Sequence, residues 1–215
     1  MTLVLTTFDW VPEFARGYVR DLRVRWLLNE IGRDYRVDTV PSADRGPEHL
    51  LRQPFAQVPM VQDGDLSLFE TGAILIHLAE GTALLPDGPD RARTIQWLIA
   101  ALNSIEPYAF RWQEAKFFDK NEAAASAAEA PLRKRLDQLQ QAMEGRDWLI
   151  EGRFTIADIL MADVLRIPAE QSLLDDLPQL AAYAERATAR PAFAKAYADQ
   201  MAHWAATDAK QQASA

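Results

Sequence analysis

The stretch QPFAQVPMVQDGDLSLFETGAILIHLAE, from Gln53 to Glu80, decides the fold of this chain. Pro59 suits the entrance of a strand, because proline lacks an N–H group and fixes its own φ. Asp63-Gly64 lies between two apolar runs and predicts a hairpin, since glycine accepts positive φ. The apolar residues from Ile74 to Leu78 have helical spacing and follow Glu70-Thr71. The stretch therefore predicts a strand, a turn, a second strand and a helix.

Glu70 and Thr71 stand where this helix is predicted to begin. A helix N-terminus offers unpaired N–H groups and the positive end of the helix dipole, which favour a carboxylate. The two residues could instead cap their own helix. In the company of Val58-Pro59 we favour ligand binding, and the stretch then describes a site for a small peptide-like anion.

The charge of the chain restricts its partners. The 215 residues include 23 Lys and Arg against 31 Asp and Glu, which gives a formal net charge of −8. Such an acidic chain is a poor candidate for binding nucleic acid or an anionic membrane surface. No apolar stretch approaches the ~20 residues that span a bilayer. The first residues, MTLVLTTFDW, lack a basic segment and read as a strand rather than a signal peptide. We expect a cytoplasmic protein with no nucleic-acid or membrane partner.

The chain contains no cysteine. A disulfide, a thiolate metal site and a cysteine nucleophile are therefore excluded. The three histidines, His49, His77 and His203, lie far apart and without paired metal-ligand spacing, so no metal site is expected. Any thiol chemistry must come from a bound ligand.

The remaining patterns predict an α/β region followed by an all-α region. Residues 2–8 read as a strand, residues 18–32 as a helix, Tyr35 to Val40 as a strand and residues 47–52 as a short helix. Two Gly and two Pro in residues 80–90 mark a linker. Beyond it only helical stripes occur. Pro107 is expected to kink or end the first of them, and the last is expected to end near Trp204, with residues 208–215 frayed.

Four segments, RVRWLLNEIG, PFAQVP, DGDLSLFETGAILIHLAE and GRFTIADI, resemble the cytosolic glutathione S-transferase family of bacterial type, and the resemblance covers roughly residues 1–205. In GRFTIADI, Thr155 and Asp158 predict a capping box that supports the fold. The resemblance implies a thioredoxin-like domain (βαβαββα) at residues 1–81, a linker at 82–90 and an all-helical domain at 91–215. It also implies a cis Val58-Pro59 bond, which turns the backbone groups of Val58 toward a ligand.

The resemblance further implies a glutathione transferase. Such an enzyme activates the thiol of bound glutathione, its cosubstrate, for attack on a small hydrophobic electrophile, typically in detoxification. Glutathione is expected to contact Gln57, Val58, Pro59, Glu70 and Thr71, with the last two residues holding the γ-glutamyl group. The alternative is a noncatalytic member of the same fold that binds glutathione or another protein.

The residue that activates the thiol is expected near the start of the first helix. A free thiol is mostly protonated at neutral pH, so a transferase must favour the thiolate. This chain has Gly17-Tyr18-Val19-Arg20 in place of the family's Ser-Pro or Cys-Pro, and a Tyr18 O–H can donate to a thiolate. Tyrosine classes carry the residue at the end of the first strand, where Thr6 or Thr7 offers a hydroxyl here. Tyr18 could instead be a half-buried packing residue.

Three arginines also lie near this helix start. Cations there oppose the helix dipole, unless the helix end faces an anion. Arg20 is therefore a candidate for binding a glutathione carboxylate or an acidic second substrate. A solvated helix face is the alternative for Arg20, and it is the expectation for Arg23.

The second-substrate pocket is expected between the two domains, where apolar walls suit a hydrophobic electrophile. Tyr108 and Trp112, next to Pro107, are the candidates for its lining, although most aromatic residues of that segment are expected in the core. The resemblance also implies a homodimer. Phe55 is either a wedge into the partner's helical domain or a residue packed within its own loop.

Overall fold

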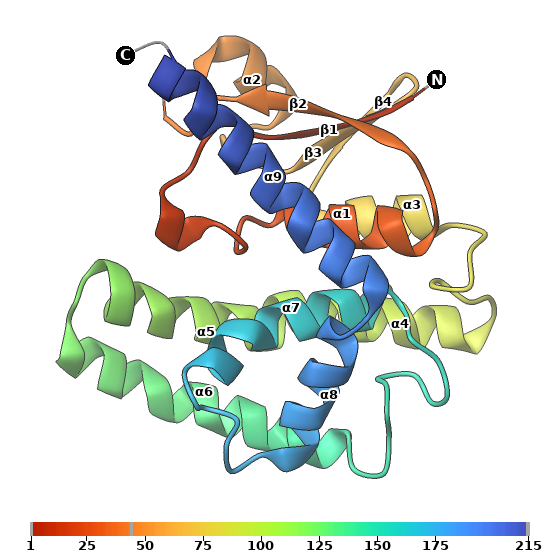
Figure 1. The fold of residues 1–215 in the computed structure, drawn as a ribbon. Helices are drawn as coiled ribbons and strands as arrows, with labels where there is room; N and C mark the ends of the chain where they lie inside the picture. The colour runs from red at the N-terminus through yellow and green to blue at the C-terminus, as the bar shows by residue number, and fades with distance from the viewer. Residues whose placement is uncertain (1, 44, 214–215) are drawn as a thin grey trace. The chain divides into compact units, whose positions relative to one another are not determined.

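The computed structural model describes residues 2–43 and 45–213. Their contacts form two compact units, one of Met1–Glu80 with Arg190–Ala215 and the other of Gly81–Ala189 (Figure 1). In this division the last helix belongs with the N-terminal unit. The domain boundaries expected from the sequence, at residues 81 and 91, stay a prediction.

The first unit is built on a four-stranded mixed sheet. Its order is β2-β1-β3-β4, with the strands β1 (Leu3–Phe8), β2 (Tyr35–Val40), β3 (Met60–Asp63) and β4 (Leu66–Phe69). Strands β1 and β2 are parallel, whereas β1 pairs with β3, and β3 with β4, in antiparallel fashion. A parallel pair needs a crossover, and α1 (Asp21–Glu30) provides it. The predicted thioredoxin-like order is confirmed.

Helices cover both faces of this sheet. Helices α1 and α3 (Thr71–Ala79) pack against each other on one face, and α2 (Gly46–Arg52) lies on the other side (Figure 1). The core between them is apolar, because alternate residues of the strands meet the apolar faces of the helices. Its fully buried members include Leu5, Trp26, Leu28, Val61 and Ile74.

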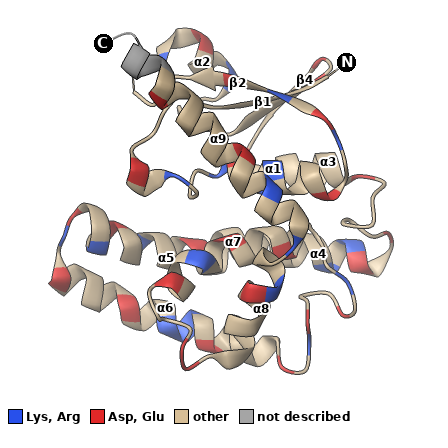
Figure 2. Cartoon of the chain, in the orientation of Figure 1, with Lys and Arg blue, Asp and Glu red and all other residues tan. Residues whose placement is uncertain are grey.

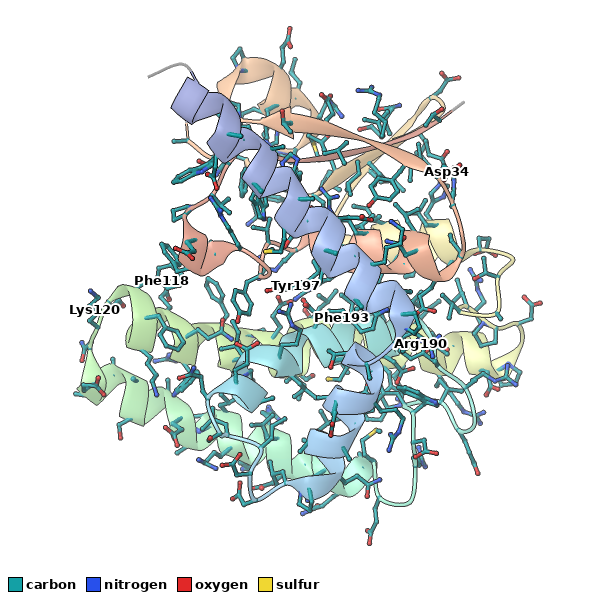
Figure 3. All side chains as sticks on the ribbon, viewed as in Figure 1. Asp34, Phe118, Lys120, Arg190, Phe193 and Tyr197 are labelled. Carbon is teal, nitrogen blue, oxygen red and sulfur yellow. The ribbon has the colours of Figure 1, made fainter. Side chains whose placement is uncertain are left out.

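Helix α9 (Pro191–Ala213) runs alongside α1. Just before α9, Arg190 donates to both carboxylate oxygens of Glu30 at 2.6 and 2.7 Å. Phe193 then meets the Trp26 ring edge-on, with ring centroids 4.8 Å apart, and Tyr197 follows one turn later (Figure 3). The expected end of this helix near Trp204 is wrong. The helix continues because the carboxylate of Asp208 is bound by Trp10 and Arg16 of its own unit.

The second unit is helical throughout its regular elements. It contains α4 (Pro89–Ala100), α5 (Glu106–Gln113), α6 (Glu122–Ala142), α7 (Ile156–Glu170) and α8 (Pro178–Thr188). Helix α7 is buried on nearly every side. The π-helical turns η2 (Ala101–Ile105) and η3 (Glu114–Phe118) flank α5. Turn η2 ends two residues before Pro107, which lacks the N–H that would continue an α-helical ladder.

The predicted capping box at the start of α7 is confirmed. One carboxylate oxygen of Asp158 accepts from the N–H of Thr155 at 2.8 Å, and the other accepts from the hydroxyl of Tyr183 at 3.0 Å. Burial raises the pKa of Asp158 to about 6, against the opposing effect of these hydrogen bonds. Residues at the capping box thus serve folding, as the sequence indicated.

No helix within residues 2–43 and 45–213 is both long and apolar enough to cross a membrane.

Candidate functional site

The peptide bond between Val58 and Pro59 is cis, as the resemblance implied. Pro59 is buried immediately before β3, Val58 is half-buried and Gln57 is exposed. The ladder between β3 and β4 begins at the pair Met60 and Phe69. The peptide groups of Val58 therefore lie just beyond the end of this ladder.

Side chains fix the loop that leads to Val58. The buried Gln53 accepts the N–H of Phe55 through its Oε1 at 2.6 Å. Ala56 adopts a positive φ of 53°, and its carbonyl accepts a hydrogen bond from the guanidinium of Arg45. The same guanidinium donates to the carbonyl of Ser42 at 2.6 Å. The sequence analysis did not identify Arg45 as an anchor, because no periodic pattern marks it.

Glu70 and Thr71 lie at the start of α3, at the same end of the β3–β4 ladder. Glu70 is the N-cap residue, with φ 68° and ψ 117°, and its side chain makes no capping hydrogen bond. The Glu70 side chain therefore does not cap α3, in contrast to the alternative expectation. A positive φ in a residue other than glycine costs on the order of 1–3 kcal/mol and occurs most often at functional sites. Glu70 is exposed, whereas Thr71 is buried.

The hydroxyls considered for thiol activation lie in different environments. Tyr18 is 37% exposed and precedes α1, and its N–H donates to the carbonyl of Ala15 at 3.1 Å. Thr6 and Thr7 are fully buried in β1, and their Oγ1 atoms have no hydrogen-bond partner. A ligand thiol reaches a surface hydroxyl more readily than a buried one. This placement favours Tyr18 over Thr7, and both roles stay predictions.

The arginines near the start of α1 differ in their surroundings. Arg20 is the N-cap residue of α1 and is half-buried. Arg23 is only 3% exposed, so the expected solvated face is wrong for this residue. Every residue of α1 from Asp21 to Leu28 is buried, the charged ones included. Arg16 forms two hydrogen bonds with Asp208, at 2.7 and 2.9 Å, and this contact holds the pKa of the carboxyl below its usual range.

A buried polar cluster stands at the first turn of α1. Arg25 donates through Nε to Asp21 Oδ2 at 2.6 Å, and Gln200 donates through Nε2 to Asp21 Oδ1, also at 2.6 Å. Asp21 and Gln200 have no exposed surface. Burial also raises the pKa of Tyr35, whose ring lies 5.9 Å from the Arg25 guanidinium carbon. The sequence analysis missed this cluster, since Gln200 lies 179 positions from Asp21.

The two residues proposed for the second-substrate pocket lie on α5. The hydroxyl of Tyr108 accepts from Arg135 Nη2 at 3.1 Å, and the guanidinium carbon lies 4.9 Å from the ring centroid. Trp112 is 1% exposed and meets the ring of Phe117 edge-on. Trp112 therefore contributes to the core of the helical unit. A role of either residue in a pocket stays a prediction.

Neither the distribution of charged residues nor the potential metal ligands in the described part of the chain point to a second site. Acidic and basic residues are interspersed over the elements of both units (Figure 2). Asp63 accepts from Arg33 at 2.6 Å and lies 2.9 Å from Nε2 of His77, which lowers the pKa of the Asp63 carboxyl, chiefly through the hydrogen bond from Arg33. In the described part of the chain, no three His, Asp or Glu side chains gather as metal ligands.

The mixed sheet, the cis proline before β3 and the helical unit with its capping box define a protein of glutathione-transferase architecture. The sequence profiles of the glutathione S-transferase N-terminal and C-terminal domains match residues 4–80 and 94–191. The chain belongs to the glutathione S-transferase family and is a glutathione transferase.

Relatives and solved structures agree with this assignment. Glutathione S-transferase 3 of Zea mays is 31% identical over 195 residues, covering 82% of this chain and 88% of that protein. Glutathione S-transferase GstA of Escherichia coli O157:H7 is 30% identical over 184 residues, covering 76% and 86%. A glutathione transferase family member from Pseudomonas fluorescens pf-5, solved with two glutathione bound, has a TM-score of 0.80 at 26% identity and covers 91% of this chain and 92% of its own. A Burkholderia graminis glutathione transferase, also with two glutathione molecules per subunit, has a TM-score of 0.79 at 25% identity, with 91% and 87% covered.

Proposed function

We propose that this protein activates the thiol of bound glutathione for attack on a hydrophobic electrophile. One observation carries the proposal. Val58-Pro59 and Glu70-Thr71 flank the same end of the β3–β4 ladder, because Met60 pairs directly with Phe69. Two segments with complementary chemistry for a peptide-like anion thus lie next to each other. The glutathione bound in the Pseudomonas fluorescens and Burkholderia graminis structures supports the proposal.

Each segment has a part in binding. The backbone of Val58 pairs with the peptide groups of glutathione, beyond the end of the ladder, where no neighbouring strand residue competes. Glu70 accepts hydrogen bonds from the ammonium of the γ-glutamyl group, and Thr71 donates to its carboxylate at the positive end of α3. The exposed Gln57 side chain and Arg20 bind the remaining polar groups. Charge-assisted hydrogen bonds of this kind are the strong ones.

Tyr18 then stabilises the thiolate. A phenol O–H that donates to sulfur favours the charged form of the thiol and lowers its pKa. A larger thiolate fraction at neutral pH makes the bound cosubstrate a better nucleophile. Tyr18 is 37% exposed, whereas the hydroxyl of Thr7 is enclosed in the core.

The decisive test is the pKa of the glutathione thiol on the purified protein, measured by ultraviolet difference titration. We expect a value well below that in solution, which Tyr18→Phe restores and Thr7→Val leaves low. A low value that Thr7→Val restores assigns the role to Thr7, and one that survives both substitutions assigns it to backbone donors. Glutathione that binds with an unchanged thiol pKa, or does not bind, supports the noncatalytic alternative, which the departure at Gly17-Tyr18 motivates.

We also propose that the protein is a homodimer. Apolar side chains are exposed around the α2 region of the first unit, including Leu51 at 87% and Phe55 at 65%. The Phe55 ring meets Phe69 edge-on at 6.2 Å, yet its own loop leaves most of it uncovered. Exposed patches of this kind mark association surfaces. Sedimentation of wild type and Phe55→Ser tests the proposal: we expect a dimer that the substitution weakens, and a monomeric wild type contradicts it.

The electrophile is proposed only as a class. An uncharged, apolar substrate suits the aromatic side chains around Pro107, of which Tyr108 is half-buried. Substituting Tyr108→Ala and comparing KM for an aryl halide with that for a small hydroperoxide tests its contribution.

A further inference from the structure

Helix α9 makes hydrogen bonds with both ends of the segment Phe8–Asp21, which carries Tyr18. At the end of β1, a ring nitrogen of His203 lies 2.9 Å from the carbonyl of Phe8, and the hydroxyl of Thr207 donates to the carbonyl of Asp9 at 3.0 Å. Further along the segment, Asp208 accepts from Trp10 Nε1 at 2.8 Å. The segment has little regular structure of its own beyond the short 3-10 turn η1 (Glu13–Ala15). Side chains of α9 therefore add to the few backbone hydrogen bonds within the segment, such as the one from Tyr18 N–H to the carbonyl of Ala15.

Gln200 is the central side chain of this arrangement. Its Oε1 accepts the N–H of Gly17 at 3.0 Å, and its Nε2 donates to the carbonyl of Val19 at 3.1 Å. The same Nε2 donates to Asp21 at 2.6 Å. The partners fix the orientation of the amide, because a flipped amide would place its oxygen against two acceptors and its nitrogen against an N–H.

These contacts fall on both sides of Tyr18. Gly17 and Val19 are its neighbours in the chain, and both are bound to the same fully buried amide. The Tyr18 side chain, by contrast, is partly exposed. The position of the Tyr18 hydroxyl depends on the backbone that carries it, and catalytic groups lose efficiency when they are displaced by about 1 Å.

We propose that Gln200 is a positioning residue for thiol activation. It holds the backbone at Gly17 and Val19 so that the hydroxyl of Tyr18 meets the sulfur of bound glutathione. Asp21 completes the arrangement, because one of its carboxylate oxygens accepts from Gln200 and the other accepts from Arg25. This inference rests on the proposed function, and it names a residue on α9 that touches neither glutathione nor the electrophile.

The test replaces Gln200 with methionine, which has a similar length but cannot reproduce the amide's hydrogen bonds. Lys195→Met is the matched control, since Lys195 is on the same helix, with a 63% exposed side chain paired to Asp199. The readouts are the thiol pKa of bound glutathione, the glutathione Kd and the urea midpoint. We expect Gln200→Met to raise the thiol pKa by about one unit, which is a tenfold change in the thiolate equilibrium. The Kd, measured at a pH where bound glutathione is still a thiol, is expected to stay within about twofold, because Val58 and Glu70 are unchanged. Lys195→Met should leave the thiol pKa unchanged.

A second comparison separates positioning from general loosening of the fold. If Gln200 acts through Tyr18, Gln200→Met adds no further rise to the thiol pKa in a Tyr18→Phe background. Additive rises overturn the inference, and so does a folded Gln200→Met protein that keeps the wild-type thiol pKa. Should Gln200→Met not fold, Gln200→Asn, which retracts the amide by one methylene, takes its place under the same criteria. A wild type that binds glutathione without lowering its thiol pKa overturns the proposed function together with this inference.

Discussion

A Cβ atom added to Gly17 would lie 2.7 Å from Cε2 of Tyr197, so the backbone before α1 and the last helix touch without room for a methyl group. Gly17 also has a φ of 83°, a conformation that residues with side chains rarely adopt. The positive φ and the close contact with the Tyr197 ring both disfavour a side chain at this position. The same residue donates its N–H to Gln200.

Gly17→Ala is expected to lower the free energy of unfolding by about 2–4 kcal/mol, because the positive φ and the overlap with Tyr197 both add to the cost. Gly32→Ala is the matched control, since Gly32 has a φ of 64° but nothing within 4 Å of the added Cβ. That control should lose only about 1–2 kcal/mol. Urea unfolding of both variants measures the difference, and equal losses would show that the contact with Tyr197 yields easily.

Thr71→Val is expected to weaken glutathione binding about tenfold, or ~1.4 kcal/mol, through loss of one hydrogen bond to a carboxylate. Valine has the shape of threonine, so the buried position at the start of α3 should still be filled. Ser67→Ala, at an exposed position of β4, serves as the control. Isothermal titration calorimetry gives the two Kd values. A Thr71→Val protein that binds as tightly as Ser67→Ala removes Thr71 from the site.

Asp21→Asn is expected to destabilise the first unit by about 3 kcal/mol, because it leaves the Arg25 charge buried without its counter-ion. The side chains of Asp21 and Arg25 are 0% and 2% exposed. Asp199→Asn provides the comparison on α9, where the pair with Lys195 is exposed, and it should cost at most about 1 kcal/mol. Chemical denaturation of both variants is the measurement. Similar small losses would mean that water reaches Arg25.

The stability of the second unit should fall as pH rises through the range in which Asp158 titrates. Burial raises its pKa to about 6 in the folded protein, against about 3.9 in an unfolded chain. Between these values the folded state binds more protons, so the stabilisation present below pH ~4 is lost as pH approaches 6. From pH 4.5 to pH 7 the loss is about 2 kcal/mol. Unfolding of wild type and Asp158→Asn across this range should show the slope in wild type alone, and parallel pH profiles would contradict the raised pKa.

Local patterns predicted much of the fold. The Asp63-Gly64 turn, the strand from Tyr35 to Val40 and the Thr155–Asp158 capping box depend on residues a few positions apart, and each occurs as expected. The length of α9 was not predictable in this way. It depends on Asp208, whose partners Trp10 and Arg16 are 198 and 192 positions away.

The site shows the same division. The sequence predicted where Val58-Pro59 and Glu70-Thr71 lie, before β3 and at the start of α3, because prolines and helix starts have local sequence signals. Their contacts with glutathione stay a prediction. Burial was harder to predict, since a run such as DLRVRWLL contains charges that suggest a solvated face. The structure instead buries Arg23 and Arg25, and a glutamine from the far end of the chain completes the cluster. No local sequence pattern predicts a partner from so far along the chain.

Helix α9 is synthesised after every other element of the first unit. Gly17 and Gln200 are separated by 183 positions, and ribosomes add about 5–20 residues per second. During that interval the residues of the sheet are present without the α9 side chains that hold the turn before α1. Contacts between such distant positions also slow folding, because closing the long loop between them costs entropy. The hydrogen bond that Gln200 accepts from Gly17 can therefore form only after α9 has left the ribosome.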